Sequence, residues 1–406
     1  MSKKTFVISR KKFYAISAAV ILVVFFAGYA FAYSSWGLFL SSQKPFSYLT
    51  RHNDLFRLIQ VNNLIKDCYI KKPDQNLLIE NAIRSLVASL EDRYSYYLDA
   101  EQYNEKKIDE SGKMAGIGLS VDLNENNELI VTRVYKGAPA DKAGIMKFDI
   151  ITAIDGVSIE EIGVENVKDK VAGDVGTDVK ITVKRGNDLK TFTITRDIVI
   201  VPMVEYRMIE EYTYIKIDRF EGESVKQFGE ALDFAEENKA KGLIIDVRWN
   251  PGGDTGIYQK IADMILPPCD LIYMEKRNGK RDYYRATDAD EYKNPIVVLV
   301  NGSSASASEA FSGTLQDYGY AKLVGTKTFG KGIAQTVYPL TGGAALRLTT
   351  SYYYLPKGRS IHEKGLQPDY TVELPAEITK TYMLNDQNDT QLKKALEVIK
   401  TMNPRE

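Results

Sequence analysis

Two short stretches in the last third of the chain carry residue types that could perform acyl-transfer chemistry. Residues 301–311, NGSSASASEAF, follow the apolar run 295–300, so they lie where a buried strand turns into a helix. A serine there is exposed at the strand end, close to helix N–H groups that polarise it. Residues 328–335, TFGKGIAQ, place Lys331 in a Gly-Lys-Gly turn and Gln335 four residues later. A lysine of ordinary pKa, about 10.4, can activate a serine only where burial or neighbours lower that pKa.

A pair of glycines could complete such a site. Gly252 and Gly253 follow 242–249, GLIIDVRW, which is typical of a fully buried strand. Glycines have no side chain to obstruct a carbonyl that approaches their backbone. Taken singly, the three stretches are ordinary: a packed or capped helix start, a solvated loop and a turn. Their joint occurrence favours catalysis.

Other catalytic templates fit poorly. The chain has no G-x-S-x-G elbow, S-x-x-K occurs only at 9–12 and 41–44, and no H-E-x-x-H is present. Only two histidines and two cysteines exist, and they form no metal-ligand pattern: His52, His362, Cys68 and Cys269. We therefore expect free thiols and neither a metal nor an organic cofactor.

A nucleotide site is the nearest alternative by motif. Residues 325–331, GTKTFGK, satisfy G-x-x-x-x-G-K, and 243–246, LIID, resembles a Walker B strand. However, Gly332 stands where Ser or Thr would bind magnesium, and the LIID strand precedes the loop instead of following it. An acyl-CoA enzyme with a paired-glycine oxyanion hole is a second alternative.

Alternating strands and helices must position these residues. From 200 to 380 the pattern predicts an α/β layered domain, with a C-terminal helix in 381–406. Residues 46–111 show three- and four-residue apolar spacing, which predicts two or three helices. Between them, 112–199 changes to short alternating strands and tight turns.

This middle region resembles a PDZ domain. Residues 137–156, GAPADKAGIMKFDIITAIDG, carry Pro-Ala, a short helix, Ala-Gly, an apolar strand and Asp-Gly in the order of that family. Phe148 departs from the pattern because the family usually has glycine there. The resemblance implies that an extended peptide adds to a strand edge, with its terminal carboxylate on backbone N–H groups. The stretch that fits this role is Gly116, Ile117, Gly118 and Leu119. The plain structural alternative is a glycine-rich strand start.

Together, SASASE at 304–309, TFGKGxxQ, NPGG at 250–253 and the PDZ-like module resemble the carboxy-terminal processing peptidases, serine proteases with a Ser–Lys dyad. The resemblance covers nearly everything after residue 33. It implies a ClpP/crotonase-like α/β core with an inserted PDZ domain. It also implies roles at six positions: Ser306 as nucleophile, Lys331 as general base, Gln335 orienting the lysine, Gly253 and Ala307 as oxyanion N–H donors, and Asp317 as a supporting acid.

The N-terminus predicts a membrane anchor. Residues 13–33 contain no charged residue, and a helix of this length spans the roughly 30 Å of a bilayer core. The charged residues of 1–12 are all basic. A polar stalk, 34–45, follows. The bulk of the chain is then extracytoplasmic, or secreted if Ala30-Phe31-Ala32 is a cleavage site.

Composition excludes other classes. With 44% hydrophobic and 26% charged residues the chain is globular, and a formal charge of −1 argues against nucleic-acid binding. The expected partners are proteins with free apolar C-termini, the membrane, and a second copy through 46–111 and the C-terminal helix. The alternative function is a catalytically silent PDZ scaffold tethered to the membrane.

Overall fold

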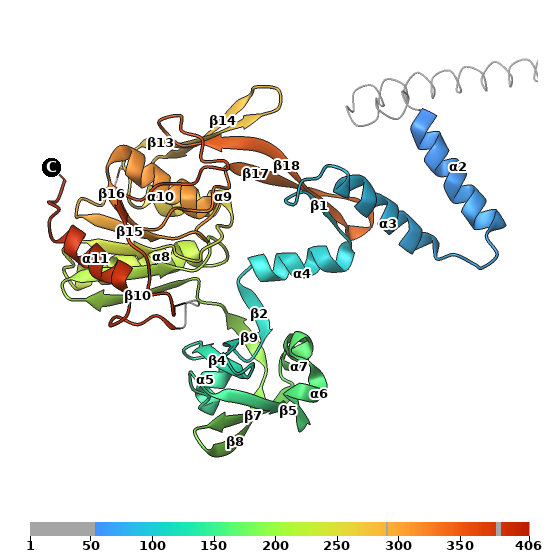
Figure 1. Cartoon of the computed structure of the whole chain (residues 1–406), viewed down its shortest axis with the longest axis horizontal. Helices are drawn as coiled ribbons and strands as arrows, with labels where there is room; N and C mark the ends of the chain where they lie inside the picture. The colour runs from blue at the N-terminus through green and yellow to red at the C-terminus, as the bar shows by residue number, and fades with distance from the viewer. Residues whose placement is uncertain (1–52, 290, 379–382, 406) are drawn as a thin grey trace, which may run out of the picture. The chain divides into compact units, whose positions relative to one another are not determined.

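The computed structural model describes residues 53–289, 291–378 and 383–405, which form two compact units with a boundary after Ile83 (Figure 1). No helix within these ranges is long and apolar enough to cross a membrane. The expected anchor at 13–33 and its flanking segments lie outside the described residues.

Within the region expected to be helical, 46–111, the described residues 53–111 form three helices and one strand. The helices are α2 (Asn53–Cys68), α3 (Gln75–Ala88) and α4 (Ala100–Glu110), and the strand is β1 (Tyr96–Leu98). The strand was not predicted, because three residues are too few to show alternation. Asp99 caps α4 by accepting the N–H of Gln102.

A five-stranded antiparallel sheet with one short extra strand forms the PDZ-like part. Its order is β3-β4-β5-β7-β8, with β6 on β5. The strands are β3 (Leu119–Leu123), β4 (Leu129–Val134), β5 (Ile150–Ile154), β6 (Val157–Ser158), β7 (Asp178–Arg185) and β8 (Asp188–Thr195). Short helices accompany them: α5 (Pro139–Ala143), α6 (Ile159–Ile162), η2 (Val164–Asn166) and α7 (Val167–Val171). Their apolar side chains build a core separate from that of the following domain.

A two-stranded stem joins this module to the rest of the chain. Strand β2 (Lys113–Gly116) pairs antiparallel with β9 (Asp197–Ile200), so the chain enters and leaves the module at one place. The module therefore leaves and rejoins the rest of the chain between α4 and β10.

The second domain is built on a six-stranded sheet of order β10-β11-β12-β15-β16-β19, in which all neighbours after the first pair are parallel. The strands are β10 (Val204–Ile209), β11 (Tyr212–Ile217), β12 (Leu243–Asp246), β15 (Ile296–Val300), β16 (Ala321–Gly325) and β19 (Tyr370–Thr371). Every residue of β12 and β15 is buried, which explains why both strands are apolar except for Asp246 at the end of β12.

Helices cover both faces of this sheet. On one face lie α8 (Ser224–Glu237), α9 (Thr255–Asp263) and α10 (Ala307–Tyr318), packed against alternate strand residues such as Leu243 and Ile245. On the other face α11 (Thr390–Ile399) packs against the intervening residues, such as Ile244. The carboxyl ends of β12 and β15 therefore meet at one edge, where loops lead into α9 and α10.

A second, antiparallel sheet is organised by the long strand β18 (Ala345–Tyr354). One edge of β18 pairs with β17 (Ile333–Pro339), and the other pairs first with β1 and then with β13 (Cys269–Lys276). Strand β14 (Arg281–Ala286) continues beyond β13. Through β1, a segment about 240 residues earlier in the chain reaches the Lys331 loop.

Candidate active site

Ser306 lies where the chain from β15 enters helix α10. Its backbone has φ 57° and ψ −117°, a conformation that residues with a side chain rarely adopt. The surroundings hold it there: its N–H donates to Glu309 at 3.0 Å, and its C=O accepts from the Tyr353 hydroxyl at 2.9 Å. Strain of this kind costs on the order of 1–3 kcal/mol and clusters at functional sites.

The glycine pair packs directly against this serine. A Cβ at Gly252, whose φ is 104°, would lie 2.9 Å from both Ser306 Cβ and Ala307 N. A Cβ at Gly253, whose φ is 147°, would lie 2.3 Å from the Phe220 oxygen. Both positions therefore require glycine. Two backbone bonds flank Gly253 without using its N–H: Phe220 N to Gly252 O at 3.0 Å and Asp254 N to Phe220 O at 2.8 Å.

Asn250, which is fully buried, ties the glycine loop to the serine loop. Its backbone oxygen accepts from Ala305 N at 3.0 Å and from Ser308 Oγ at 2.9 Å. Its side-chain oxygen accepts from Gly252 N, and its Nδ2 donates to Ile217 O, both at 2.9 Å. The two loops therefore form one rigid block at the carboxyl edge of the sheet.

Glu309 connects the serine loop to the lysine loop. One carboxylate oxygen accepts from Thr328 Oγ1 at 2.6 Å and Gly330 N at 2.7 Å, and the other from Ser306 N at 3.0 Å and Lys331 N at 2.8 Å. Burial raises the pKa of this carboxyl, and the hydrogen bonds oppose that rise. Glu309 belongs to the SASASE stretch, but no role was predicted for it from the sequence. Its place three residues after a serine at a helix start, the capping-box spacing, was the available signal.

Lys331 lies in a half-buried position next to β1. Its Nζ is 4.6 Å from the centre of the Tyr94 ring. Burial, together with the nearby guanidinium groups of Arg347 and Arg93, lowers the pKa of Lys331 to about 8. The depression that a lysine base requires is thus present, with a cause in the structure. Tyr94 and Arg93 gave no signal in the sequence, because they precede the lysine by more than 230 residues.

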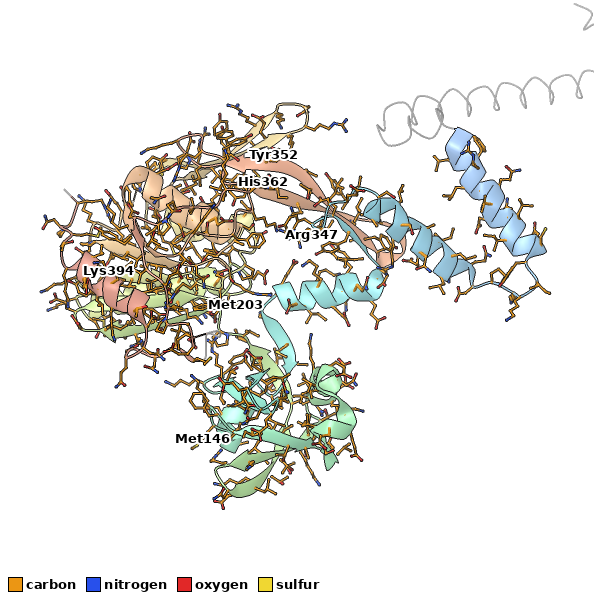
Figure 2. The ribbon with its side chains drawn as sticks, in the orientation of Figure 1. Met146, Met203, Arg347, Tyr352, His362 and Lys394 are labelled. Carbon is orange, nitrogen blue, oxygen red and sulfur yellow. The ribbon has the colours of Figure 1, made fainter. Side chains whose placement is uncertain are left out.

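One cleft of about 570 Å³ brings most of the expected residues together: Ser306, Ala307, Gly253, Lys331 and Gln335 all line it. The Gln335 side chain donates to Thr349 Oγ1 at 3.2 Å and accepts from Arg347 at 3.4 Å, so its observed contacts are with β18. Arg347 projects from β18 (Figure 2) and also donates to the Tyr96 hydroxyl at 2.9 Å.

Asp317 is the expected site residue that the structure places elsewhere. It lies near the far end of α10, eleven residues after Ser306, which is about 16 Å at the helical rise. There it pairs with Arg359 at 2.6 Å and accepts Lys357 N at 3.1 Å. Its support is therefore given to the 357–359 turn and not to the cleft.

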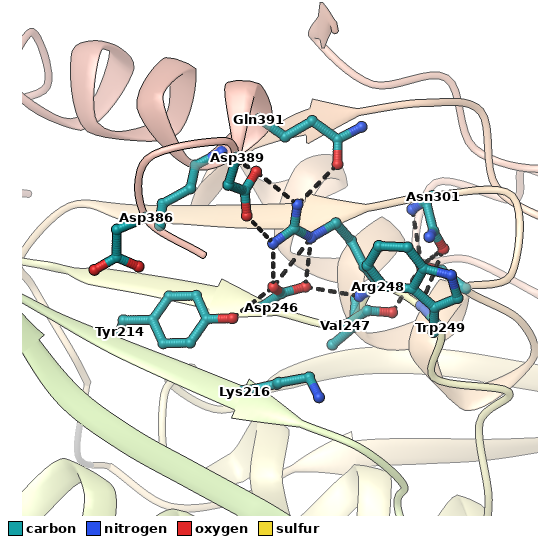
Figure 3. A network of polar contacts seen from close by, with 12 residues as sticks. Tyr214, Lys216, Asp246, Val247, Arg248, Trp249, Asn301, Asp386, Asp389 and Gln391 are labelled. Atoms are coloured by element: carbon teal, nitrogen blue, oxygen red, sulfur yellow. Dashed lines mark hydrogen bonds and ion pairs between the residues drawn. The ribbon is translucent and has the colours of Figure 1, made fainter. Parts of the chain in front are cut away.

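A buried charge network lies at the end of β12, a few residues before the glycine pair in the chain (Figure 3). The Arg248 side chain is 1% exposed and bonds to Asp246 at 2.6 Å, Asp389 at 2.6 Å and Gln391 at 3.0 Å. Tyr214 donates to Asp246 at 2.7 Å. The network joins the end of β12 to the N-terminal cap of α11. The network was not predicted from the sequence, although two charged residues that close an apolar strand were a usable signal.

The PDZ-like module has its own groove, of about 370 Å³, and all four predicted residues line it: Gly116, Ile117, Gly118 and Leu119. Strand β3 forms one wall and α7 the other. Within the described residues β3 pairs on one side only, with β4. Gly118 has φ 79°, and a Cβ there would lie 2.3 Å from Ala138 Cβ, so only glycine fits.

Comparison with known proteins finds a matching family for three parts of the chain. Residues 211–372 match the model of peptidase family S41, 115–195 match a PDZ domain, and 33–102 match the N-terminal domain of the activating protease CtpB. A carboxyl-terminal-processing protease of Synechocystis sp. is 34% identical over 329 residues, covering 78% of this chain and 77% of that protein. A carboxy-terminal-processing protease of Bartonella bacilliformis is 35% identical over 347 residues, covering 82% and 77%.

Among solved structures, an S41 protease of Bacteroides fragilis superposes with a TM-score of 0.58 at 17% identity, covering 84% of this chain and 97% of that one. This likeness supports the fold. Together with the sequence matches, it shows that the chain belongs to the S41 serine peptidases, in the PDZ-containing group of carboxyl-terminal processing proteases.

Proposed function

We propose that this protein is a serine endopeptidase in which Ser306 and Lys331 form the catalytic dyad. The observation that carries the proposal is the strained serine packed against two glycines, in the same cleft as a lysine whose pKa is lowered to about 8. Neutral Lys331 accepts the Ser306 hydroxyl proton as Oγ bonds to the scissile carbonyl carbon. The N–H groups of Gly253 and Ala307 stabilise the resulting oxyanion.

Breakdown of the intermediate uses the same groups in reverse. The lysine ammonium returns its proton to the leaving amine as the C–N bond breaks, which leaves an acyl group on Ser306. Water then attacks the acyl carbon, Lys331 accepts its proton, and the serine is regenerated. Gln335 keeps Arg347 in place beside the lysine, which supports an orienting role through the electrostatics of the cleft.

The PDZ-like module is proposed to bind the free C-terminus of the protein substrate and to gate proteolysis. Its groove is lined mainly by apolar side chains, including Leu119, Val121 and Val167, which suits an apolar C-terminal residue. The open edge of β3 offers backbone groups for strand addition.

Membrane attachment is part of the proposal. The uncharged run 13–33 after a basic N-terminus supports a single-pass anchor with the protease outside the cytoplasm. A homodimer through α2 and α3 is supported by their exposed apolar side chains, such as Phe56 (70% exposed) and Leu58 (53%). Helix α11, the other expected dimer element, uses its apolar face on its own sheet.

The test is cleavage of an unstructured protein, β-casein, by the full-length chain. Ser306→Ala and Lys331→Ala are expected to lose at least a thousandfold in kcat/KM. Ser303→Ala and Lys327→Ala, exposed residues of the same two loops, serve as matched controls and are expected to stay active. Equal cleavage by all variants would contradict the dyad. Absence of cleavage with retained binding of an apolar C-terminal peptide would favour the scaffold.

A further inference from the structure

Strand β17 has one paired edge and one edge with no strand beside it. In the sheet of the described residues, β17 pairs only with β18. Residues of an antiparallel pair alternate: every second one exchanges both backbone hydrogen bonds with its partner, and the others direct N–H and C=O to the opposite edge. The register of β17 therefore decides which of its backbone groups are open.

Two backbone bonds fix this register on both sides of the irregularity that lies between Ala334 and Gln335. Before it, Tyr353 N donates to Gly332 O at 3.0 Å; after it, Leu340 N donates to Ala344 O at 2.8 Å. Even-numbered residues of β17 thus face β18 throughout. The backbone groups of the odd-numbered residues Ile333, Gln335 and Val337 face the open edge.

A hydrogen bond made by β18 supports the same register. Thr349, which lies opposite Gln335, donates its N–H away from β17 to Ser95 Oγ at 2.9 Å. Pro339 also indicates that the odd-numbered residues of β17 face the open edge, because a proline has no N–H and is tolerated in a strand only where that group would face an open edge. Pro339 also marks the point beyond which no ladder can continue.

The open edge lies in the catalytic cleft. Ile333, Ala334, Gln335 and Val337 line it together with Ser306 and Lys331, and the strand begins two residues after the lysine. From Ile333 to Val337 the edge extends about 13 Å, the length of about five residues of extended chain.

We propose that the substrate polypeptide adds to β17 as an extra strand, held through the backbone groups of Ile333, Gln335 and Val337. This rests on the proposed function, and it assigns to β17 the recognition of extended main chain on one side of the scissile bond. Because backbone groups make the contacts, binding tolerates many sequences, and folded segments must unfold locally to enter. Pro339 limits the ladder to about five substrate residues.

The experiment is an N-methyl scan with the full-length protein. A twelve-residue peptide is taken from β-casein around a bond that the protein cuts, and each amide nitrogen is methylated in turn. We expect kcat/KM to fall roughly two- to tenfold at alternate amides on one side of the bond, with smaller effects at those between, over about five residues. Equal losses at consecutive amides, or no loss, would overturn the proposal.

A pair of variants tests the same edge from the protein side. Val337→Pro removes an outward N–H without removing a bond to β18, whereas Val337→Ala shortens the side chain and keeps the N–H. A ratio of kcat/KM values for β-casein of at least threefold in favour of the alanine variant is expected; equal values with native circular dichroism would refute it. Labelling of wild-type Ser306 by a fluorophosphonate separates the two proposals. If the fluorophosphonate does not label Ser306 and β-casein is not cleaved, the proposed function fails and the inference fails with it. If Ser306 is labelled but kcat/KM does not alternate along the methylated amides, only the inference fails.

Discussion

Activity should depend on pH through the Lys331 amine. Only the neutral amine accepts a proton, and a pKa of about 8 makes it roughly one-tenth neutral at pH 7, one-half at pH 8 and nine-tenths at pH 9. A lysine at its ordinary pKa would be only about 0.04% neutral at pH 7. We therefore expect kcat/KM to rise nearly tenfold from pH 6 to pH 7 and to level off above pH 9.

The perturbation that probes the cause is Arg347→Met, which keeps the length of the side chain and removes a cation near the lysine. The Arg347 guanidinium lowers the pKa of Lys331, so its removal should raise that pKa and shift the rate profile to higher pH. Burial, the largest cause, remains, and the new midpoint should therefore stay below the ordinary lysine value. Each unit of upward shift lowers the rate at pH 7 about tenfold.

The assay is the rate of Ser306 labelling by a fluorophosphonate from pH 6 to pH 10, which reports the activated serine independently of peptide binding. Arg285→Met is the matched control, because Arg285 is exposed and pairs with Asp270 away from the cleft. A flat profile for the wild type, or a midpoint in Arg347→Met at or below the wild-type value, would refute the reasoning.

Four further predictions concern stability and assembly of the site. Lys331→Met should raise the free energy of unfolding at pH 7 by about 1–2 kcal/mol, discounted for partial exposure, and this gain should vanish as pH rises from 8 to 10.5; urea unfolding at pH 7 and 10 measures it. Glu309→Gln replaces one carboxylate oxygen by an NH2 group, so at least one of the three N–H groups that Glu309 accepts loses its acceptor. It should cost about 2–4 kcal/mol and slow labelling of the serine at least tenfold, and unchanged labelling would contradict a role for Glu309 in joining the serine and lysine loops. Asp389→Ala should cost about 3–5 kcal/mol, against up to about 1 kcal/mol for the exposed Asp386→Ala, and similar midpoints in urea would contradict a buried charge network. Phe148→Gly should raise the melting temperature by several degrees, since φ is 72° there.

Sequence patterns predicted the parts of the molecule that local spacing encodes. The strand-rich character of 112–199 and the alternating α/β core follow from hydrophobic periodicity. The insertion and the roles of the cleft residues were implied by the family resemblance that SASASE and TFGKGxxQ carry. At Phe148 the pattern lacked its usual glycine, yet the backbone keeps the conformation of glycine, with the Phe148 N–H donating to Val131 O at 2.7 Å. Neighbouring bonds there impose a turn that the residue itself disfavours.

The remainder depends on contacts between distant segments. Strand β1 exists because β18 pairs with it, and it brings Tyr94 to Lys331 from far upstream. The family resemblance implied a supporting role for Asp317, but Asp317 lies near the far end of α10 from Ser306 and pairs with Arg359. The positions of these residues depend on contacts between segments that are far apart in the chain, and a short stretch of sequence carries no information about such contacts.

The position of Asp389 has a consequence for the order in which the protein becomes active. Ribosomes make the chain from the N-terminus, so the serine, the glycine pair and the lysine are all synthesised before the acid that neutralises Arg248. Before Asp389 and α11 have been synthesised, Arg248 is paired with Asp246 alone. The face of the sheet that α11 covers in the finished protein is then exposed to solvent. The glycine loop therefore acquires its full support only after the last part of the chain has folded onto the sheet.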